Sequence, residues 1–337
     1  MLFLTYSFYP GIYHIAVVCT GQNLTIKVNY NKSMIEVCDP APVNYSEIIT
    51  ALASNWPVLE EIEYAVQCDK KILKSDTVFN EDCTLKVVEI CQGFSDFSEL
   101  QALEYAKVEA INCTKNDGIF LPVIISDETI ETVRLELLRR VAVFRRFNAS
   151  ENTMREFISV FLVGAVLFVN KDVTSPSELI EIIAENQIRG IRARGPVDYD
   201  LIFELFHICI AEAKKEKIEQ GFYQNVAQMV ACRDKYVYDT KKRKRDEPGV
   251  DYIQDIPSTG IVSTGDHWIF LKYMYEEGAW KIYRSEEIVV SLTQDVLKDK
   301  TQCFPSLKAV IGRIVGMLND QKQLVSKLIN LKKIRNL

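Results

Sequence analysis

The sequence predicts a multidomain protein of mixed α+β and α/β class. Two observations lead to this prediction. The chain has 337 residues, of which 48% are hydrophobic, so it is long enough for two domains that each bury a core. The apolar pattern also changes along the chain, from short β-like runs over 1–92 to runs at helical spacing from residue 93 onward. We therefore expect a small β-rich domain over 1–92, a helical connector over 93–147 and a larger domain over 148–337.

Composition excludes some classes of protein. The formal net charge of −6 argues against a protein that coats nucleic acid indiscriminately, but it allows one positive cleft. The nine cysteines form no C-x-x-C pair, which favours reduced thiols over a disulfide framework or a zinc site. Residues 1–8 are apolar but lack the basic start and cleavage site of a convincing signal peptide. The longest apolar run, 157–169, is too short to span a bilayer, so we expect a buried core helix and no membrane partner.

Four strands and one helix are predicted in the first domain. Runs over 12–19 and 24–28 flank Thr-Gly-Gln-Asn, a favourable hairpin connection. An amphipathic helix that is preceded by residues 44–47 and reaches about residue 54 follows, and two further strands are expected over 63–67 and 84–89. This order of elements suits a β-grasp fold, with an ordinary small α+β domain as the alternative.

The connector is predicted to hold two helices. The first covers 97–112. The second begins after Ser126, a favourable N-cap residue, and carries apolar residues at helical spacing. Another capped helix starts at Ser150 and continues through 157–169, and it opens the larger domain.

A basic stretch precedes the most informative part of the sequence. We predict a helix over 177–186 and a first strand over 188–193. Three arginines lie within or just after this strand, namely Arg189, Arg192 and Arg194. Together with Lys215 they are suited to contacts with nucleic-acid phosphates. Charges that protect a strand edge from unwanted pairing are an equally good interpretation of the arginines.

Two acids and a lysine are expected to converge at one end of the next strands. A turn at Gly195 precedes Asp198, and the β-prone run 207–214 ends with Glu212 and Lys214. Alternate side chains share a face of a strand, so Glu212 and Lys214 point the same way. Hairpin pairing would bring Asp198 to the same end. Two carboxylates and an ammonium suit metal-assisted hydrolysis of a phosphodiester, because carboxylate oxygens bind Mg²⁺ and the ammonium offsets charge on the phosphate.

A polar helix is predicted over 216–231, directly after this strand. Gln220, Gln224 and Gln228 are four residues apart and share one helical face, where they can hydrogen-bond a DNA backbone or the surroundings of the lysine. His207 lies on the opposite strand face from Glu212, so we expect it to be a packing residue and not a base.

The order and spacing of these residues resemble a known family. The residues that carry the resemblance are Asp198, Glu212, Ala213, Lys214, Gln224 and Gln228. They are similar to the Asp…Glu-x-Lys…Gln-x-x-x-Gln signature of the PD-(D/E)XK, or restriction-endonuclease-like, nucleases. Glu151 with Arg155 resembles the first motif of the same superfamily. The whole chain resembles a Crinkler-type effector, which joins an N-terminal ubiquitin-like domain to such a nuclease domain of αβββαβ order.

The resemblance implies a role for each residue. Mg²⁺ or Mn²⁺ would be held by Asp198, Glu212, the backbone carbonyl of Ala213, and Glu151. Glu156 competes with Glu151 for the last position. Lys214 would position or activate water, while Gln224 and Gln228 would order the site and the phosphate. The expected product is cleaved DNA.

A compact basic run follows the polar helix. It consists of Lys241, Lys242, Arg243, Lys244 and Arg245. A nuclear localisation signal requires such an exposed cluster, and a solvated loop is the alternative. The resemblance implies a protein that is secreted and acts in a host nucleus, with host proteins as partners of its ubiquitin-like domain.

The remaining sequence is expected to complete the domain. Two strands around a Thr-Gly-Asp turn place Trp268 and Phe270 in the core. A helical pattern covers 305–337, weakened by Gly312 and divided near Asn319. This pattern is expected to pack on the nuclease core, with a homodimer as the minority interpretation.

Two alternatives come from other functional classes. The nuclease fold could bind DNA or a host protein without catalysis. The ubiquitin-like domain could instead be the active part, which would make the protein an adaptor.

Overall fold

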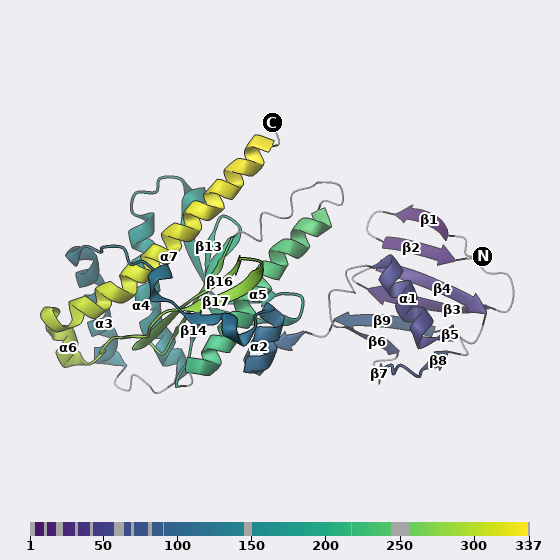
Figure 1. Cartoon of the computed structure of the whole chain (residues 1–337), viewed down its shortest axis with the longest axis horizontal. Helices are drawn as coiled ribbons and strands as arrows, with labels where there is room; N and C mark the ends of the chain where they lie inside the picture. The colour runs from purple at the N-terminus through teal and green to yellow at the C-terminus, as the bar shows by residue number, and fades with distance from the viewer. Residues whose placement is uncertain are drawn as a thin grey trace. The chain divides into compact units, whose positions relative to one another are not determined.

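A computed structural model describes residues 4–9, 12–17, 23–30, 33–40, 43–56, 64–68, 71–79, 83–89, 91–144, 150–216, 218–243 and 256–335. Contacts between residues group the chain into two compact units, Met1–Cys91 and Gln92–Leu337. Among the described residues the first unit combines strands with one helix, and the second combines strands with several (Figure 1), which confirms the mixed α and β class. Residues 92–144, where a connector was expected, belong to the larger unit.

The first unit contains a sheet in the order β1-β2-β4-β3-β9-β6-β7. The strand bounds are β1 Leu4–Tyr9, β2 Ile12–Val17, β3 Asn23–Tyr30, β4 Ser33–Pro40, β6 Tyr64–Cys68, β7 Lys71–Ile72 and β9 Cys83–Glu89. β3 and β9 run parallel to each other, whereas β3 with β4 and β6 with β9 are antiparallel pairs. β5 (Val43–Asn44) and β8 (Val78–Phe79) form a separate small pair.

Helix α1 (Tyr45–Asn55) packs on this sheet. Its N-cap is Asn44, whose side chain accepts a hydrogen bond from the Glu47 backbone while the Glu47 carboxylate accepts one from the Asn44 backbone. This capping box fixes where the helix begins. Ile48 and Leu52, one turn apart, are fully buried in a cluster with the central strands.

The predicted hairpin of the first unit is wrong. In the described part of this sheet β2 pairs with β1 and with β4 but not with β3, and the consecutive antiparallel pairs are β1 with β2 and β3 with β4. The prediction contained neither β1 nor β4. Within β4 the neighbouring apolar residues Met34 and Ile35 interrupt the alternation, which weakens the period-two signal of a half-buried strand.

The second unit is built on a larger sheet in the order β10-β13-β14-β15-β16-β17-β11, with β12 paired to β13 and β18 to β16. The strand bounds are β10 Gln92–Gly93, β11 Cys113–Lys115, β12 Ile180–Arg189, β13 Ala193–Phe203, β14 Phe206–Ala213, β15 Ser258–Ser263, β16 His267–Glu276, β17 Ala279–Arg284 and β18 Ile288–Val289. β12, β13 and β14 form an antiparallel meander, whereas β15 is parallel to β14. A parallel pair needs a crossover connection, and α5 is in that connection.

Helices cover both faces of this sheet. Their bounds are α2 Glu99–Ala106, α3 Asp127–Val143, α4 Glu151–Asn170, α5 Ile218–Arg243, α6 Gln294–Lys298 and α7 Lys300–Arg335. Short 3₁₀ turns are η2 Phe94–Asp96, η3 Ala110–Asn112, η4 Asp117–Ile119 and η5 Pro176–Glu178. α3, α4 and α7 pack with one set of buried strand residues, and α2 and α5 with another. The unit therefore has three layers, with the sheet in the middle.

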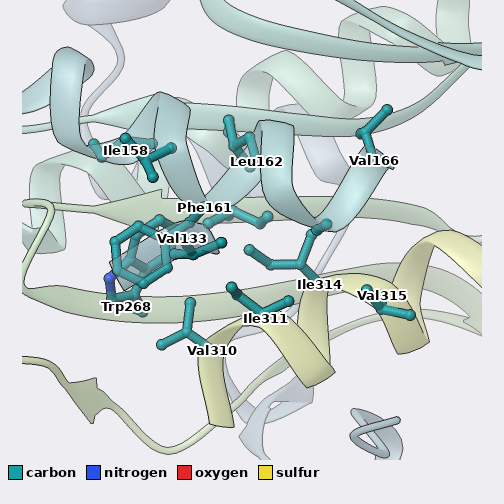
Figure 2. Close-up of a cluster of buried hydrophobic side chains, with 14 of the residues drawn as sticks. Val133, Ile158, Phe161, Leu162, Val166, Trp268, Val310, Ile311, Ile314 and Val315 are labelled. Atoms are coloured by element: carbon teal, nitrogen blue, oxygen red, sulfur yellow. The ribbon is translucent and has the colours of Figure 1, made fainter. Parts of the chain in front are cut away.

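The core between α4, α7 and the sheet is the larger of the two in this unit. Figure 2 shows Phe161 of α4 between α4 and α7, where Ile311 and Ile314 of α7 face it, and Ile158 and Leu162 belong to the same buried cluster. The rings of Phe161 and Trp268 have centroids 4.7 Å apart. Trp268 and Phe270 are fully buried, as the sequence predicted. This packing holds β13 and β14 rigidly from one side.

α4 is the one described helix that is long and apolar enough to cross a membrane by length and composition. Half of its apolar window is buried inside the unit. Phe157, Phe161 and Ala165 are fully buried in the core, as expected for a core helix over 157–169.

The predicted helix over 177–186 and the strand over 188–193 are wrong. η5 and β12 occupy the first range, and the second contains the end of β12 and the start of β13. Glu and Ala favour a helix locally, but tertiary pairing with the whole length of β13 overrides this preference. The predicted turn at Gly195 is also wrong, because Gly195 lies inside β13. Its φ of +151° and a Phe94 ring atom 3.1 Å from where a Cβ would lie both favour glycine there.

The helix boundaries of the prediction are partly correct. Ser126 and Ser150 cap α3 and α4 as expected. The helix predicted over 97–112 is shorter, because α2 ends at Ala106 and Lys107 adopts a left-handed conformation with φ +55°. The predicted division of the C-terminal helical pattern near Asn319 is wrong, since α7 is continuous.

Candidate active site

Strands β13 and β14 bring two buried acids to one end of the sheet. The Ala213 backbone N–H donates a hydrogen bond of 2.6 Å to Asp198 Oδ2. The register that pairs Tyr199 with Ala211 places Asp198 opposite Glu212. Asp198 is only 6% exposed and Glu212 only 3%. The predicted convergence of the two carboxylates is therefore present.

Lys214 lies directly beside these acids. Its Nζ donates a hydrogen bond of 2.7 Å to Glu212 Oε1, as expected for alternate residues at a strand end. The Lys214 backbone N–H donates to the Ser263 carbonyl at 2.9 Å, so β15 fixes the position of the lysine main chain. Gly221 of α5 leaves room for the side chain, because a Cβ there would lie 2.7 Å from Lys214 Cγ.

Helix α5 supports Glu212 from the other side. Gln228 Nε2 donates a hydrogen bond of 2.7 Å to Glu212 Oε2, so both oxygens of this carboxylate have donors. Asn225 in turn donates to Gln228 Oε1 at 3.2 Å and to the Ile210 carbonyl at 3.0 Å. Gln228 and Asn225 are fully buried, and this chain of hydrogen bonds fixes the orientation of Glu212.

Gln224 lies one turn before Gln228 on the same helix. It is 8% exposed, and its Oε1 is buried without a hydrogen-bond partner among the described residues. A buried amide oxygen without a donor is uncommon in native structures. Gln220, the third predicted glutamine, is exposed.

The start of α4 adds one cation and one further acid. The Arg155 guanidinium forms ion pairs with Asp198 Oδ1, with Glu151 at 3.5 Å and with Glu185 of β12 at 3.0 Å. Glu156 instead lies 3.9 Å from Arg140. Of the two competing glutamates, Glu151 is therefore the one linked to the acids.

The two central carboxylates have unusual acidities. Burial raises the pKa of Asp198 above its ordinary value, against the opposing effects of the Ala213 N–H and of Arg155. Burial and the negative charge of Asp198 raise the pKa of Glu212 to about 7. A buried carboxyl that lies next to a second carboxylate has a raised pKa, and such pairs are typical of functional sites.

The chemistry of these donors fits a magnesium ion. No group of three or more His, Cys, Asp or Glu side chains in the described part of the chain is arranged to hold a metal. Mg²⁺ does not need such a cage, because it keeps several waters and is held by one or two carboxylates. Asp198 and Glu212 would provide the two carboxylates, and a divalent cation would offset the repulsion between them.

Comparison with known proteins adds no family. No family model matches the chain, and no curated protein matches it. The function is therefore argued from the geometry of this site.

The predicted phosphate-binding residues lie on or next to β12, β13 and β14. Arg192 is 3.4 Å from Glu104 and 6.0 Å from the Tyr105 ring centroid, so it contacts α2. Arg189 and Arg194 are exposed and pair with each other in the register of β12 and β13. Lys215 is also exposed.

The predicted nuclear localisation signal lies only partly within the described residues. Lys241, Lys242 and Arg243 belong to the last turn of α5. Lys244 and Arg245 lie outside the described residues.

Sequence reasoning missed several polar residues around the site. His207 does not only pack, because its Nδ1 lies 2.6 Å from Asp200 Oδ2, which also accepts a hydrogen bond of 2.6 Å from Asn186. Asp200 is fully buried. No sequence pattern indicated Asp200, because the residues that contact it, Asn186 and His207, come from two other strands. Asn225 gave no signal either, because its role depends on a strand that α5 meets only in the folded protein.

Proposed function

We propose that this chain is a metal-dependent DNA endonuclease of the PD-(D/E)XK type. The observation that carries the proposal is the convergence of Asp198, Glu212 and Lys214, with Gln228 bonded to Glu212. Two acids and a lysine are buried together at a cost in folding stability. Such an arrangement is expected where a cation and a phosphate are to be bound.

The order of the elements supports the same proposal. The main elements of this part of the chain have the order αβββαβ, and β15 is parallel to β14. They are α4, β12, β13, β14, α5 and β15. This is the order that the resemblance to restriction-endonuclease-like nucleases implies. The acids lie on the second and third strands of this series, and the glutamines lie on its second helix.

Asp198, Glu212 and the Ala213 carbonyl would hold Mg²⁺ or Mn²⁺, with Glu151 close by through Arg155. When bound, such an ion stabilises charge on a phosphate and lowers the pKa of a water ligand. The Ala213 N–H and Gln228 keep the two carboxylates in place for this binding. Hard oxygen donors suit these ions better than softer metals.

Lys214 positions the attacking water and offsets charge that develops on the phosphate. The Lys214 side chain is 14% exposed, so it is partly accessible from solvent, and its ammonium is held on Glu212. Its main chain is fixed by Ser263 and its stem by Gly221. Gln224 Oε1, with no partner among the described residues, can accept a hydrogen bond from a bound water. These residues supply positioning and electrostatic stabilisation, on which phosphoryl-transfer chemistry depends.

A nicking assay tests this function. The intact protein is incubated with supercoiled plasmid in Mg²⁺ or Mn²⁺, and in EDTA. We expect nicking with metal only, and its loss in Lys214→Ala. Lys171→Ala removes the same charge from an exposed position on the far end of α4 and should leave nicking unchanged. No cleavage by the folded parent protein in either metal would refute the assignment.

We further propose that the first unit is the ubiquitin-like domain of a Crinkler-type effector that acts in a nucleus. The central parallel pair β3–β9 and the order β4-β3-β9-β6-β7, with α1 packed on it, support a β-grasp fold. A ubiquitin-like domain engages other proteins, so one alternative is that the protein is an adaptor. The other alternative is that the nuclease fold of the second unit binds DNA or host proteins without catalysis. A chain that ends at Cys91, and so lacks the second unit, would favour the adaptor if it kept all biological activity.

A further inference from the structure

One cation lies among the acids of the site and has no part in the proposed binding of metal or phosphate. Arg155 of α4 contacts Asp198 Oδ1 through one guanidinium nitrogen and Glu185 through another, at 3.0 Å. The same nitrogen that contacts Asp198 is 3.5 Å from Glu151. The Arg155 side chain is 25% exposed, and its Nε is buried without a hydrogen-bond partner among the described residues. The guanidinium is therefore held by charges at its tip alone, with no bond at Nε that opposes its movement.

The charges around Arg155 do not balance. Two groups of ion pairs interact electrostatically through Asp198, and together they contain four carboxylates and two cations. Their members are Asp198, Glu212, Glu151, Glu185, Arg155 and Lys214. The formal charge of this set is −2 when all of its members are ionised. One divalent cation carries the opposite charge. The site is therefore electrostatically suited to take up such an ion while Arg155 stays nearby.

Glu185 is placed to receive the arginine. The register that pairs Ala184 with Tyr199 and Asn186 with Val197 places Glu185 opposite Asp198. Its φ of +53° is a left-handed conformation that a non-glycine residue adopts at a cost. The Glu185 side chain is 72% exposed, whereas that of Asp198 is 7% exposed. An arginine that leaves Asp198 therefore moves toward solvent and keeps a carboxylate partner.

The sheet is irregular at the same place. Val197 packs in the cluster with α5, whereas Tyr199 packs in the cluster with α4. In a regular strand these two residues would share a face. The alternation of side chains between the two faces of β13 therefore changes at Asp198, which lies opposite Glu185. Both carboxylates contact Arg155 at this irregularity.

We propose that Arg155 is an internal counter-ion that occupies the cation position on Asp198, and that a divalent metal displaces it onto Glu185. This inference rests on the proposed metal-dependent function. Arg155 is a positioning residue here, since it acts through Asp198. A guanidinium and a divalent ion on the same carboxylate repel each other strongly in partly buried surroundings. The arginine therefore sets the concentration of metal at which the site fills.

Titration calorimetry of the intact protein with Mn²⁺ alone tests this, without substrate or turnover. Arg155→Gln removes the competing charge and should bind Mn²⁺ about tenfold more tightly than the parent. Glu185→Gln removes the carboxylate that receives the arginine and should bind up to about fivefold more weakly. Glu181→Gln, which changes an exposed glutamate on the same strand, is the matched control for charge and should change affinity less than Glu185→Gln.

The outcomes separate the inference from the function on which it rests. If Arg155 only holds Asp198 in place, Arg155→Gln will bind Mn²⁺ more weakly, and the inference is overturned. If the parent binds no Mn²⁺, the metal site and the proposed function are overturned together with it. A second measurement on the unaltered protein covers the case in which Arg155→Gln does not fold. The Arg155 side-chain N–H resonance, assigned with Arg155→Lys, should shift on addition of Mg²⁺, and metal binding without that shift would contradict the displacement.

Discussion

The strongest prediction concerns the stability of the metal-free protein when Glu212 is changed to glutamine. Glu212 is 3% exposed, and its pKa is raised from 4.5 to about 7 by burial and by Asp198. One pKa unit corresponds to about 1.36 kcal/mol, so the ionised carboxylate lowers the free energy of unfolding by roughly 3 kcal/mol. Glutamine has a similar shape and carries no charge. Glu212→Gln should therefore be more stable than the parent at pH 8 in EDTA.

The sign of the pH dependence follows from the direction of the shift. Below about pH 4.5 the carboxyl is protonated in both the folded and the unfolded protein, and it has no effect. Between about pH 4.5 and 7 the folded protein binds more protons than the unfolded one, so the stability of the parent falls as the pH rises. The burial that raises the pKa of Asp198 acts in the same direction. The advantage of Glu212→Gln should therefore be absent at pH 4 and fully developed at pH 8.

Urea denaturation at both pH values, followed by circular dichroism, measures this difference. Glu181→Gln is the control, because it removes an exposed carboxylate from β12. Added Mg²⁺ should stabilise the parent at pH 8 and should have no effect on Glu212→Gln. An equal advantage of Glu212→Gln at pH 4 and pH 8, or none at pH 8, would refute the reasoning from burial and charge.

Three further variants test other contacts. Gly221→Ala places a Cβ 2.7 Å from Lys214 Cγ. We expect it to lower nicking at least about tenfold while the protein stays folded, and unchanged nicking would contradict the positioning role of this glycine. Asn225→Ala leaves Gln228 Oε1 and a buried carbonyl without their donor, so urea denaturation should show a loss of about 1–3 kcal/mol. Phe161→Ala empties a fully buried position and should cost about 3–5 kcal/mol in the same assay, and a loss under about 1 kcal/mol would contradict the tight packing of this core.

The site could be predicted from the sequence where its residues follow local periodicity. Glu212 and Lys214 share a strand face because they are two residues apart, and their side chains are bonded to each other. Gln228 was placed on the correct helix face by the spacing of four. Asp198 needed one further assumption, a hairpin pairing of two neighbouring strands, and β13 and β14 form that pair.

Arg155 shows what local pattern cannot supply. It was noticed only as the end of a motif that begins with Glu151. Its contacts with Asp198 and Glu185 join α4 to β13 and β12, which are far from it in sequence. No periodicity within one element encodes such a contact. Distance in sequence also explains the error over β12, where the composition favours a helix and only the pairing with β13 produces a strand.

The dependence of the central core on α7 has a consequence for synthesis on the ribosome. Leu307, Val310, Ile311 and Ile314 of α7 are fully buried against α4 and the sheet (Figure 2). At Gly312 and Gly316 the helix approaches the main chain of Val123 and Leu121 so closely that a Cβ would lie 2.6 Å and 2.2 Å from their carbonyl oxygens. α7 follows every strand of this sheet in the chain, so translation produces it after both Asp198 and Glu212. A nascent chain that still lacks α7 exposes one apolar face beneath β13 and β14, so the second unit can complete its core only once that helix has left the exit tunnel.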